Sequence, residues 1–244
     1  MFAELLWLEE GIYAALGPSI ALFTNGRLSV RDLRRVAFKV YVDASPFRRW
    51  MQALRPYICP FDELVAMVPV RARVLDVGCG AGLFLVLLDA TGRVESGYGF
   101  DASGLAIRAA RRASEKLRTS RLRFEQRKIE EGIPRGDWQV VSVIDVLHHI
   151  TPARQATFLR EVAAAVPAGG QLLLKDMVCR PVWRATANRL HDLLLARQWV
   201  HHVDPATAED WLQGSGLVVR RRWKSNDFWY GHWAVIFERT QPTE

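Results

Sequence analysis

One stretch constrains the fold of this chain more than any other, the run Val74-Leu-Asp-Val-Gly-Cys-Gly-Ala-Gly82. An apolar run ends in three glycines at every second position, and an apolar helical segment over Ala81 to Ala90 follows at once. Glycine tolerates positive φ and lets the backbone approach a ligand closely. The pattern therefore predicts a strand that turns sharply into a helix, which is where open α/β sheets bind their ligands.

The remainder of the chain continues this alternation of strands and helices. Helical segments such as Ser103 to Leu117 and Thr151 to Val166 separate strand-like runs. The strand-like runs are at 73–77, 94–100, 122–126, 138–144, 171–175, 217–223 and 233–238. Alternating β and α segments predict a mostly parallel sheet with helices on both faces. We therefore predict a doubly wound α/β fold, with a mostly parallel seven-stranded sheet whose last strand is antiparallel.

Residues 1–70 contain no such alternation and read as helical. Apolar residues recur at three-and-four spacing between Arg31 and Leu54, the pattern of one buried helical face. We expect an N-terminal helical cap over residues 1–70, an α/β ligand-binding domain over residues 71–240, and an inserted helical cap at about 180–202. The apolar run from Gly11 to Phe23 is shorter than the ~20 residues that a membrane span needs, so we expect no transmembrane span.

Composition and charge exclude several classes of protein. Half of the 244 residues are apolar, which excludes a disordered chain. The three cysteines are scattered, which disfavours a disulfide scaffold and favours a reducing, cytoplasmic compartment, with peripheral membrane contact left open. Lys and Arg (33) outnumber Asp and Glu (26), and many of them lie in residues 27–55. This basic segment fits nucleic acid, anionic lipid or an acidic carrier protein, or is an ordinary solvated surface.

Two carboxylates accompany the glycines and indicate the chemistry of the ligand. Asp76 stands two positions before Gly78, where it would repel a pyrophosphate and favour a cationic or ammonium group. Asp101 ends the second predicted strand, 19 residues after Gly82, where a carboxylate can accept both hydroxyls of a ribose. These features favour a nucleoside with a positive, unphosphorylated appendage, and S-adenosylmethionine fits that description.

On these residues the sequence resembles the class I S-adenosylmethionine-dependent methyltransferases. Residues 74–82 resemble the first motif of that family, 140–149 its fourth motif and 167–174 the turn into its fifth strand, so the resemblance covers about 70–240. It implies that residues 71–240 are a methyltransferase domain, with S-adenosylmethionine as cofactor and S-adenosylhomocysteine as product. The cofactor-binding residues that it implies are Asp76, Gly78, Cys79, Gly80, Gly82, Asp101, Ala102, Ile129, Asp145, Val146 and Leu147. Lys128 stands where many members carry an acid for the adenine amine, so the adenine must be held by the backbone, by Glu130 or mostly by stacking.

The acceptor of the methyl group should lie beyond the carboxyl ends of the first, fourth and fifth strands. His148 and His149 follow the fourth strand and are candidate general bases, because a neutral imidazole can take a proton near its usual pKa of ~6.5. Equally, either ring could cap or pack under the next helix. The expected substrate-binding residues are Tyr41, Lys175, Asp176, His191 and Tyr230. We expect no metal, because His191, His201 and His202 lack a helical i, i+4 pair and a supporting cysteine.

The expected function is methyl transfer to a small-molecule, lipid-like or carrier-bound biosynthetic acceptor, with O- or C-methylation favoured. Residues 27–55 are the expected contact for an acidic carrier protein or a partner enzyme. One alternative is an RNA or DNA methyltransferase, which the positive charge favours. Against it, the fourth motif is Asp145-Val-Leu-His148 rather than the Asn/Asp-Pro-Pro-aromatic pattern used on a flipped base. Another alternative is a non-catalytic cofactor-binding subunit of a biosynthetic complex.

Overall fold

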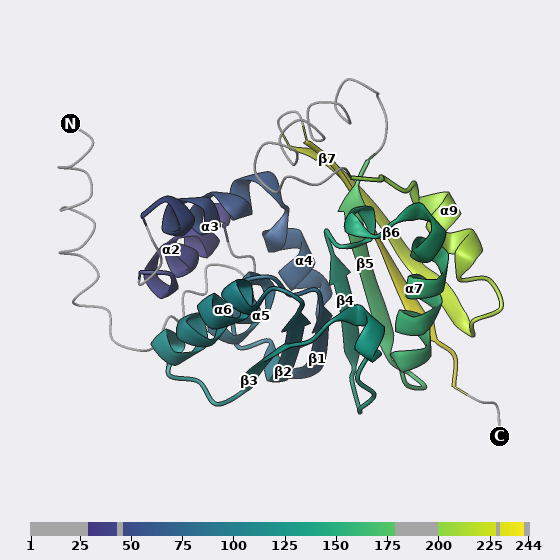
Figure 1. Cartoon of the computed structure of the whole chain (residues 1–244), viewed down its shortest axis with the longest axis horizontal. Coiled ribbons are helices and arrows are strands. Elements are labelled where there is room, and N and C mark those ends of the chain that lie inside the picture. Colours follow the sequence, from purple (N-terminus) through teal and green to yellow (C-terminus); the bar gives the residue numbers. More distant parts are fainter. Residues whose placement is uncertain (1–28, 43–45, 179–199, 228–229, 242–244) are drawn as a thin grey trace.

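A seven-stranded sheet forms the centre of the molecule, in a computed structural model that describes residues 29–42, 46–178, 200–227 and 230–241 (Figure 1). The strand order is β3-β2-β1-β4-β5-β7-β6. The strands are β1 (Ala72–Val77), β2 (Val94–Asp101), β3 (Leu122–Gln126), β4 (Val140–Ile144), β5 (Gln171–Met177), β6 (Leu217–Asp227) and β7 (Tyr230–Arg239). The α-helices are α2 (Val30–Val40), α3 (Pro46–Ile58), α4 (Phe61–Met67), α5 (Leu83–Ala90), α6 (Gly104–Leu117), α7 (Pro152–Ala165) and α9 (Pro205–Trp211).

The sheet confirms the predicted fold class. β1 pairs in parallel with β2 and β4, β2 with β3, and β4 with β5. β7, the last strand, is antiparallel to both of its neighbours, β5 and β6. Parallel strands bring their carboxyl ends to the same edge of the sheet, so the loops after β1, β2, β4 and β5 converge there.

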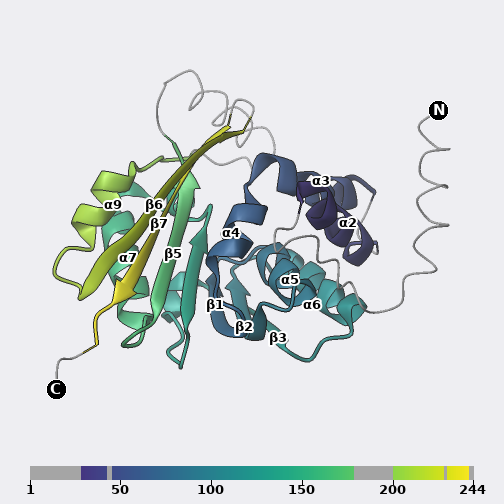
Figure 2. The ribbon, with the colours of Figure 1, turned by 180° about the vertical axis from the view of Figure 1, so that it is seen from behind.

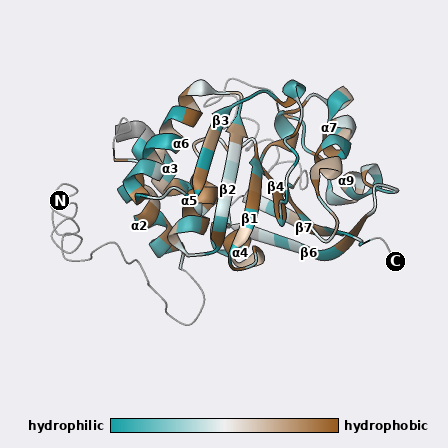
Figure 3. Ribbon diagram, turned by 90° about the horizontal axis from the view of Figure 1, so that it is seen from below, coloured by the Kyte–Doolittle hydropathy of each residue, from teal (hydrophilic) through white to brown (hydrophobic). Residues whose placement is uncertain are grey.

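Helices cover both faces of the sheet. α5 and α6 lie on one face together with the N-terminal helices, and α7 and α9 lie on the other (Figures 1 and 2). The central strands β1 and β4 are largely hydrophobic, whereas helices such as α6 and α7 carry both hydrophilic and hydrophobic residues (Figure 3). The alternation of side chains along each strand divides the core in two: Val74 and Leu173 pack with α5, whereas Leu75 and Leu174 pack with α7.

The N-terminal helices belong to the first of these cores. Leu33 and Val40 on the buried face of α2 lie in the same apolar cluster as Val74 of β1 and Leu87 of α5. The periodic pattern between Arg31 and Leu54 is not one helix, because the chain turns after α2 and starts again at α3. Among the described residues, no helix has both the length and the apolar character to cross a membrane.

One further difference concerns a helix boundary, and one predicted helical segment is not described in full. The helix expected from Ala81 begins at Leu83, because Gly82 has a left-handed backbone, with φ of +77°, that ends the preceding turn. The inserted helical cap at about 180–202 falls almost entirely outside the described residues, which resume at Val200.

Candidate active site

The glycine loop after β1 has the close-approach geometry that the sequence predicts. Gly78, Gly80 and Gly82 all have positive φ, at +70°, +55° and +77°. A side chain at Gly82 would meet the ring of Phe124 at 2.7 Å, so this position needs glycine for packing as well as for backbone conformation. A Cβ at Gly80 would meet nothing within 4 Å, so the middle of the loop faces open space. A ligand can therefore lie directly against the backbone here.

Asp76 lies beneath this loop and is 3% exposed. Ser142 of β4 donates a hydrogen bond of 2.7 Å from its hydroxyl to Asp76 Oδ1. Burial raises the pKa of Asp76 to about 7, and Asp101 adds to this, while the Ser142 hydrogen bond and Arg55 oppose it. A carboxyl group whose pKa lies near neutral pH can lose its proton when a cationic ligand binds beside it.

Asp101 at the end of β2 faces the same loop. Its Oδ2 accepts a hydrogen bond from the Gly80 amide at 2.9 Å, and its Oδ1 accepts one from the Ser103 amide at 2.8 Å. The carboxylate thus spans the glycine loop and the start of α6. Ala102 is exposed beside it, Ile129 is half-buried after β3, and Cys79 is buried in the loop. The expected cofactor residues of β1, β2 and β3 therefore meet at one edge of the sheet.

The N-terminal helices reach this edge as well. Tyr41, which follows α2, is buried and donates a hydrogen bond of 2.5 Å from its hydroxyl to the Ala81 carbonyl in the glycine loop. Arg55 of α3 is half-buried and lies close enough to lower the pKa of both Tyr41 and Asp76, although burial raises the pKa of each overall. Tyr41, which the sequence placed among the substrate residues, supports the glycine loop in the structure, and its contact with substrate stays a prediction. The site role of Arg55 was missed, because it is one of many arginines in residues 27–55.

A buried ion pair lies at the ends of β4 and β5. Lys175, which is fully buried, has its Nζ 2.5 Å from Asp145 Oδ1. Asp145 itself has a strained backbone, with φ of +56°. Burial alone would raise the pKa of Asp145, but Lys175, with smaller contributions from His148 and His232, holds it well below its usual range. Burial likewise disfavours the charged form of Lys175, and Asp145 overcomes this and raises its pKa.

A second buried pair lies on the other face of β5. The ring Nδ1 of His148 is in hydrogen-bond contact with Asp176 Oδ1, and the His148 amide donates to Asp176 Oδ2 at 3.1 Å. Both side chains are almost completely buried, whereas the adjacent His149 is exposed, with its ring centre 4.2 Å from that of His148. Because the Asp176 carboxylate engages Nδ1, it favours the tautomer that carries the proton on Nδ1 and the lone pair on Nε2.

The segment after Val200 packs over His148 and is held by two buried side chains. The His201 amide donates to the His148 carbonyl at 2.8 Å. Gln155 Nε2 donates to the carbonyls of Leu147 and His201, and Trp233 Nε1 donates to the Val203 carbonyl at 3.1 Å. Sequence reasoning missed Gln155 and Trp233 because their partners are backbone atoms far away in the chain.

Lys175 and Asp176 were expected to bind substrate directly. In the structure each of them forms an ion pair or hydrogen bond with another residue of the protein. They are fully buried, and each is paired with a residue of the loop after β4. Val146 and Leu147 of that loop are buried, with Val146 packed against Gly78. His191 lies outside the described residues. For Tyr230 the structure describes the backbone at the start of β7 and not the side chain.

Asp145, His148 and Asp176 also offer oxygen and nitrogen atoms within 4.8 Å of one another, as metal ligands do. The Lys175 ammonium already neutralises Asp145, and His148 Nδ1 already engages Asp176. A divalent cation here would be placed beside a buried ammonium, so we assign no metal to these residues.

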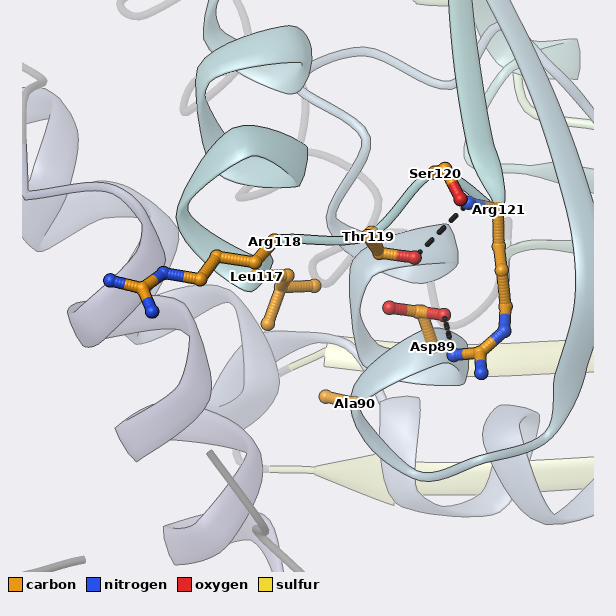
Figure 4. A pocket seen from close by; sticks show the side chains of 7 residues that line it. All are labelled: Asp89, Ala90, Leu117, Arg118, Thr119, Ser120 and Arg121. Carbon is orange, nitrogen blue, oxygen red and sulfur yellow. Dashed lines mark hydrogen bonds and ion pairs between the residues drawn. The ribbon is translucent and has the colours of Figure 1, made fainter. Parts of the chain in front are cut away.

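A cavity of about 290 Å³ lies elsewhere, at the carboxyl-terminal ends of α5 and α6 (Figure 4). Asp89 and Arg121 form an ion pair on its wall, with a distance of 3.2 Å. Helices that follow parallel strands run back along the sheet, so this cavity is at the opposite edge from the glycine loop. It therefore has no part in the site described above.

The fold and the glycine loop together define an α/β enzyme that binds a nucleoside-containing cofactor at the carboxyl edge of its sheet. Residues 47–221 match a family of methyltransferase domains. The chain therefore belongs to the class I S-adenosylmethionine-dependent methyltransferases.

Individual known proteins are similar to this chain over most of its length. A ubiquinone biosynthesis O-methyltransferase from Rhodopseudomonas palustris (strain BisB5) is 30% identical over 157 residues, which are 60% of this chain and 58% of that enzyme. The chain thus matches little more than half the length of this relative. A solved structure of an O-methyltransferase family protein from Burkholderia thailandensis matches with 20% identity and a TM-score of 0.62. The match covers 98% of this chain and 71% of that protein. The magnesium protoporphyrin IX methyltransferase of Synechocystis PCC 6803, solved with bound S-adenosylhomocysteine, has 19% identity and a TM-score of 0.62, over 86% of this chain and all of that one.

Proposed function

We propose that this enzyme methylates an oxygen of a small-molecule or lipid-like biosynthetic acceptor, free or carried by another protein. The observation that carries the proposal is the buried His148–Asp176 pair at the carboxyl ends of β4 and β5. A hydroxyl acceptor must lose a proton when it gains a methyl group, and an imidazole held by a carboxylate is suited to accept that proton. The names of the curated relatives, which are O-methyltransferases of ubiquinone biosynthesis, support oxygen as the accepting atom.

The residues around the glycine loop are proposed to hold the cofactor. Arg55 would pair with the carboxylate of its methionine part and Asp76 with the ammonium group, because the positive charge of Arg55 acts on the buried Asp76 carboxyl beneath the loop and lowers its pKa. Asp101 would accept the ribose hydroxyls, with Ala102 and Ile129 beside the adenine. Lys128 begins the turn of residues 129–131, its amide donating to the Glu131 carboxylate at 2.8 Å, and it is not proposed as an adenine ligand.

The transfer itself is a direct displacement at carbon. Bound S-adenosylmethionine supplies a methyl group on a positively charged sulfur, and transfer leaves a neutral thioether. The enzyme must hold the acceptor oxygen in line with that methyl group. His148 Nε2 would take the hydroxyl proton as the new O–C bond forms, and Asp176 would hold the ring in the tautomer that leaves Nε2 able to accept it. Lys175 would position Asp145, and through it the loop that borders the methyl group.

We also propose a cytoplasmic location for the enzyme. Cys59 and Cys79 are both buried free thiols, which fits a reducing compartment.

The test compares single-turnover rates with a panel of phenols and catechols for the wild type, His148→Ala, Asp176→Asn and, as a matched control, His149→Ala. We expect His148→Ala to lower the rate about 10²–10⁴-fold at unchanged cofactor affinity, since that is the usual contribution of a general base. His149→Ala should stay within about tenfold of the wild type. A loss below about tenfold for His148→Ala would rule out the base role. Mass spectrometry of the product distinguishes a methyl ether from a C-methyl compound, and formation of the latter alone would contradict O-methylation.

A further inference from the structure

The positive charge of the chain is concentrated on two neighbouring helices. α2, α6 and Arg118, which ends α6, carry nine Lys or Arg residues and two carboxylates. Their net charge of +7 equals that of the whole chain, so the remaining residues are neutral in sum. α2 lies beside α6 at one end of the molecule (Figures 1 and 2). We call these nine cations the basic face: Arg31, Arg34, Arg35, Lys39, Arg108, Arg111, Arg112, Lys116 and Arg118.

Sequence reasoning did not join the two halves of this surface, because it took residues 27–55 as the candidate docking segment and read residues 103–117 only as a basic amphipathic helix. Arg49 of the docking segment lies against Phe38, with its guanidinium carbon 3.7 Å from the ring centre. The charge of Arg55 acts on Tyr41 and Asp76 at the cofactor site and lowers the pKa of each. The helix that completes the basic face, α6, is more than 60 residues further along the chain. The side chain of Arg118 extends from the end of α6 toward the N-terminal helices (Figure 4).

Most of the basic face makes no contribution to the fold through ion pairs. Arg35 is 3.5 Å from Asp32, and Arg111 donates to the Phe124 carbonyl. The other arginines and Lys39 differ. Within the described part of the chain, no side-chain hydrogen bond or ion pair engages the exposed residues Arg31, Arg34, Lys39, Arg108, Arg112 and Arg118. Like charges so close together repel each other, and an oppositely charged partner would relieve that repulsion.

The side chains between these cations indicate what kind of partner fits. A surface that enters a membrane carries aromatic or apolar residues among its cations, and one that binds single-stranded nucleic acid carries aromatic rings for the bases. Among the large apolar residues exposed in the described part of the chain, Val42 and Leu105 adjoin α2 and α6, while the aromatic Trp50 lies on α3, which packs against α2, and not between the cations of α2 and α6. The arginines instead repeat at three-and-four spacing on both helices, which matches carboxylates on the side of another helix.

We propose that the basic face is a docking surface for an acidic protein whose carboxylates lie along an exposed helix. Val42 follows Tyr41, which binds the glycine loop, and Leu105 lies two residues after Ser103, whose amide binds Asp101. A partner seated on the face therefore lies at the rim of the cofactor site, with these two apolar side chains at its inner end. The proposal concerns binding alone and holds whichever acceptor the enzyme methylates.

The test measures binding of a fluorescent, glutamate-rich helical peptide of about 20 residues, long enough to lie along α6. The face variant is Arg31→Glu, Arg34→Glu, Arg108→Glu and Arg112→Glu together. A matched control reverses four exposed arginines elsewhere: Arg71, Arg135, Arg154 and Arg221. We expect the face variant to bind the peptide at least about tenfold more weakly than the wild type and the control variant to stay close to the wild type. Cofactor affinity should be equal in all three proteins, which separates this test from that of the proposed function.

Two outcomes would overturn the proposal. One is equal loss of peptide binding in the face and control variants, which would show nonspecific attraction. The other is tighter binding of the wild type to phosphatidylglycerol-containing vesicles or to single-stranded DNA than to the peptide, again lost only in the face variant. If charge reversal prevents folding, the four arginine-to-glutamine changes at the same positions keep the test decisive, because they remove charge without adding repulsion.

Discussion

At the scale of single residues, the carboxyl edge of the sheet holds charges that are compensated in different ways. Asp145 and Asp176 each have a basic partner from a neighbouring loop or strand. Asp76 accepts a hydrogen bond from the Ser142 hydroxyl, and no side chain of the described residues forms an ion pair with it. The pKa of Asp145 is held low by Lys175, and that of Asp76 is raised by burial. The protonation of Asp76 therefore changes near neutral pH.

This difference leads to a prediction about pH. The pKa of Asp76 lies at about 7 in the ligand-free protein, far above its ordinary value, so its protonated form is favoured below that pH. A cationic ligand favours the charged form, so binding of S-adenosylmethionine should release a proton and become tighter as the pH rises through 7. Calorimetry in buffers of different ionisation enthalpy measures both effects. Asp76→Asn should bind more weakly and without the pH dependence around 7; an unchanged pH profile in this variant would contradict the assignment.

At the scale of elements, the glycine loop joins two requirements in one short segment. Gly82 has a positive φ and no room for a side chain, since a Cβ would meet Phe124 and Ala110 at under 3 Å. Gly80 has a positive φ and open space around it. Gly82 is therefore needed for the packing of α5 and α6 against β3, and Gly80 keeps the space above the loop open for the ligand.

The two glycines should consequently respond differently to alanine. Gly82→Ala should lower the free energy of unfolding by about 2–5 kcal/mol, from left-handed strain plus overpacking. Gly80→Ala should cost only the strain, about 1–2 kcal/mol, but should weaken cofactor binding, since its methyl group occupies the space above the loop. Urea denaturation and calorimetry measure the two quantities. If both changes lowered the free energy of unfolding by similar amounts, backbone strain alone would account for the loss, and the predicted overpacking at Gly82 would be wrong.

The elements also show how far the sequence alone can be taken. The strands, their mostly parallel pairing and the antiparallel end follow from apolar runs and from the presence or absence of helices between them, whereas the order of the strands in the sheet was not predicted. Because the apolar runs mark where the strands end, the glycines and the acids at those ends can be recognised from the sequence as well. The pairing of Lys175 with Asp145 is not visible, because it depends on the register that places Ile144 opposite Lys175. The contribution of Arg55 depends on how α3 packs over the sheet, which the pattern of residues 31–54 does not specify.

At the scale of the whole molecule, the N-terminal helices and the sheet share an apolar core. Leu33 of α2 is fully buried in the cluster that also contains Val74 of β1. The N-terminal helical segment is therefore proposed to unfold together with the α/β domain rather than as a separate cap.

Leu33→Ala tests this proposal. It should lower the free energy of unfolding of the entire chain by about 2–5 kcal/mol, the usual cost of truncating a buried leucine. Circular dichroism, tryptophan fluorescence and native-state hydrogen exchange of β1 and β4 should shift together. Val42→Ala, at a position 41% exposed, is the control and should have little effect. A stable sheet with a frayed N-terminal segment would contradict the shared core.

The position of Lys175 next to Asp176 on β5 has a consequence for how the sheet assembles. Neighbouring residues of a strand point to opposite faces, so the ammonium meets Asp145 on one side and the carboxylate meets His148 on the other. A slip of β5 by one residue would exchange the two, leaving acid against acid on one side and two bases together on the other. Repulsion between the two carboxylates would thus raise the free energy of a misaligned strand even where its apolar side chains still fit. The order Lys175-Asp176 therefore favours the native alignment of β5 over a one-residue slip.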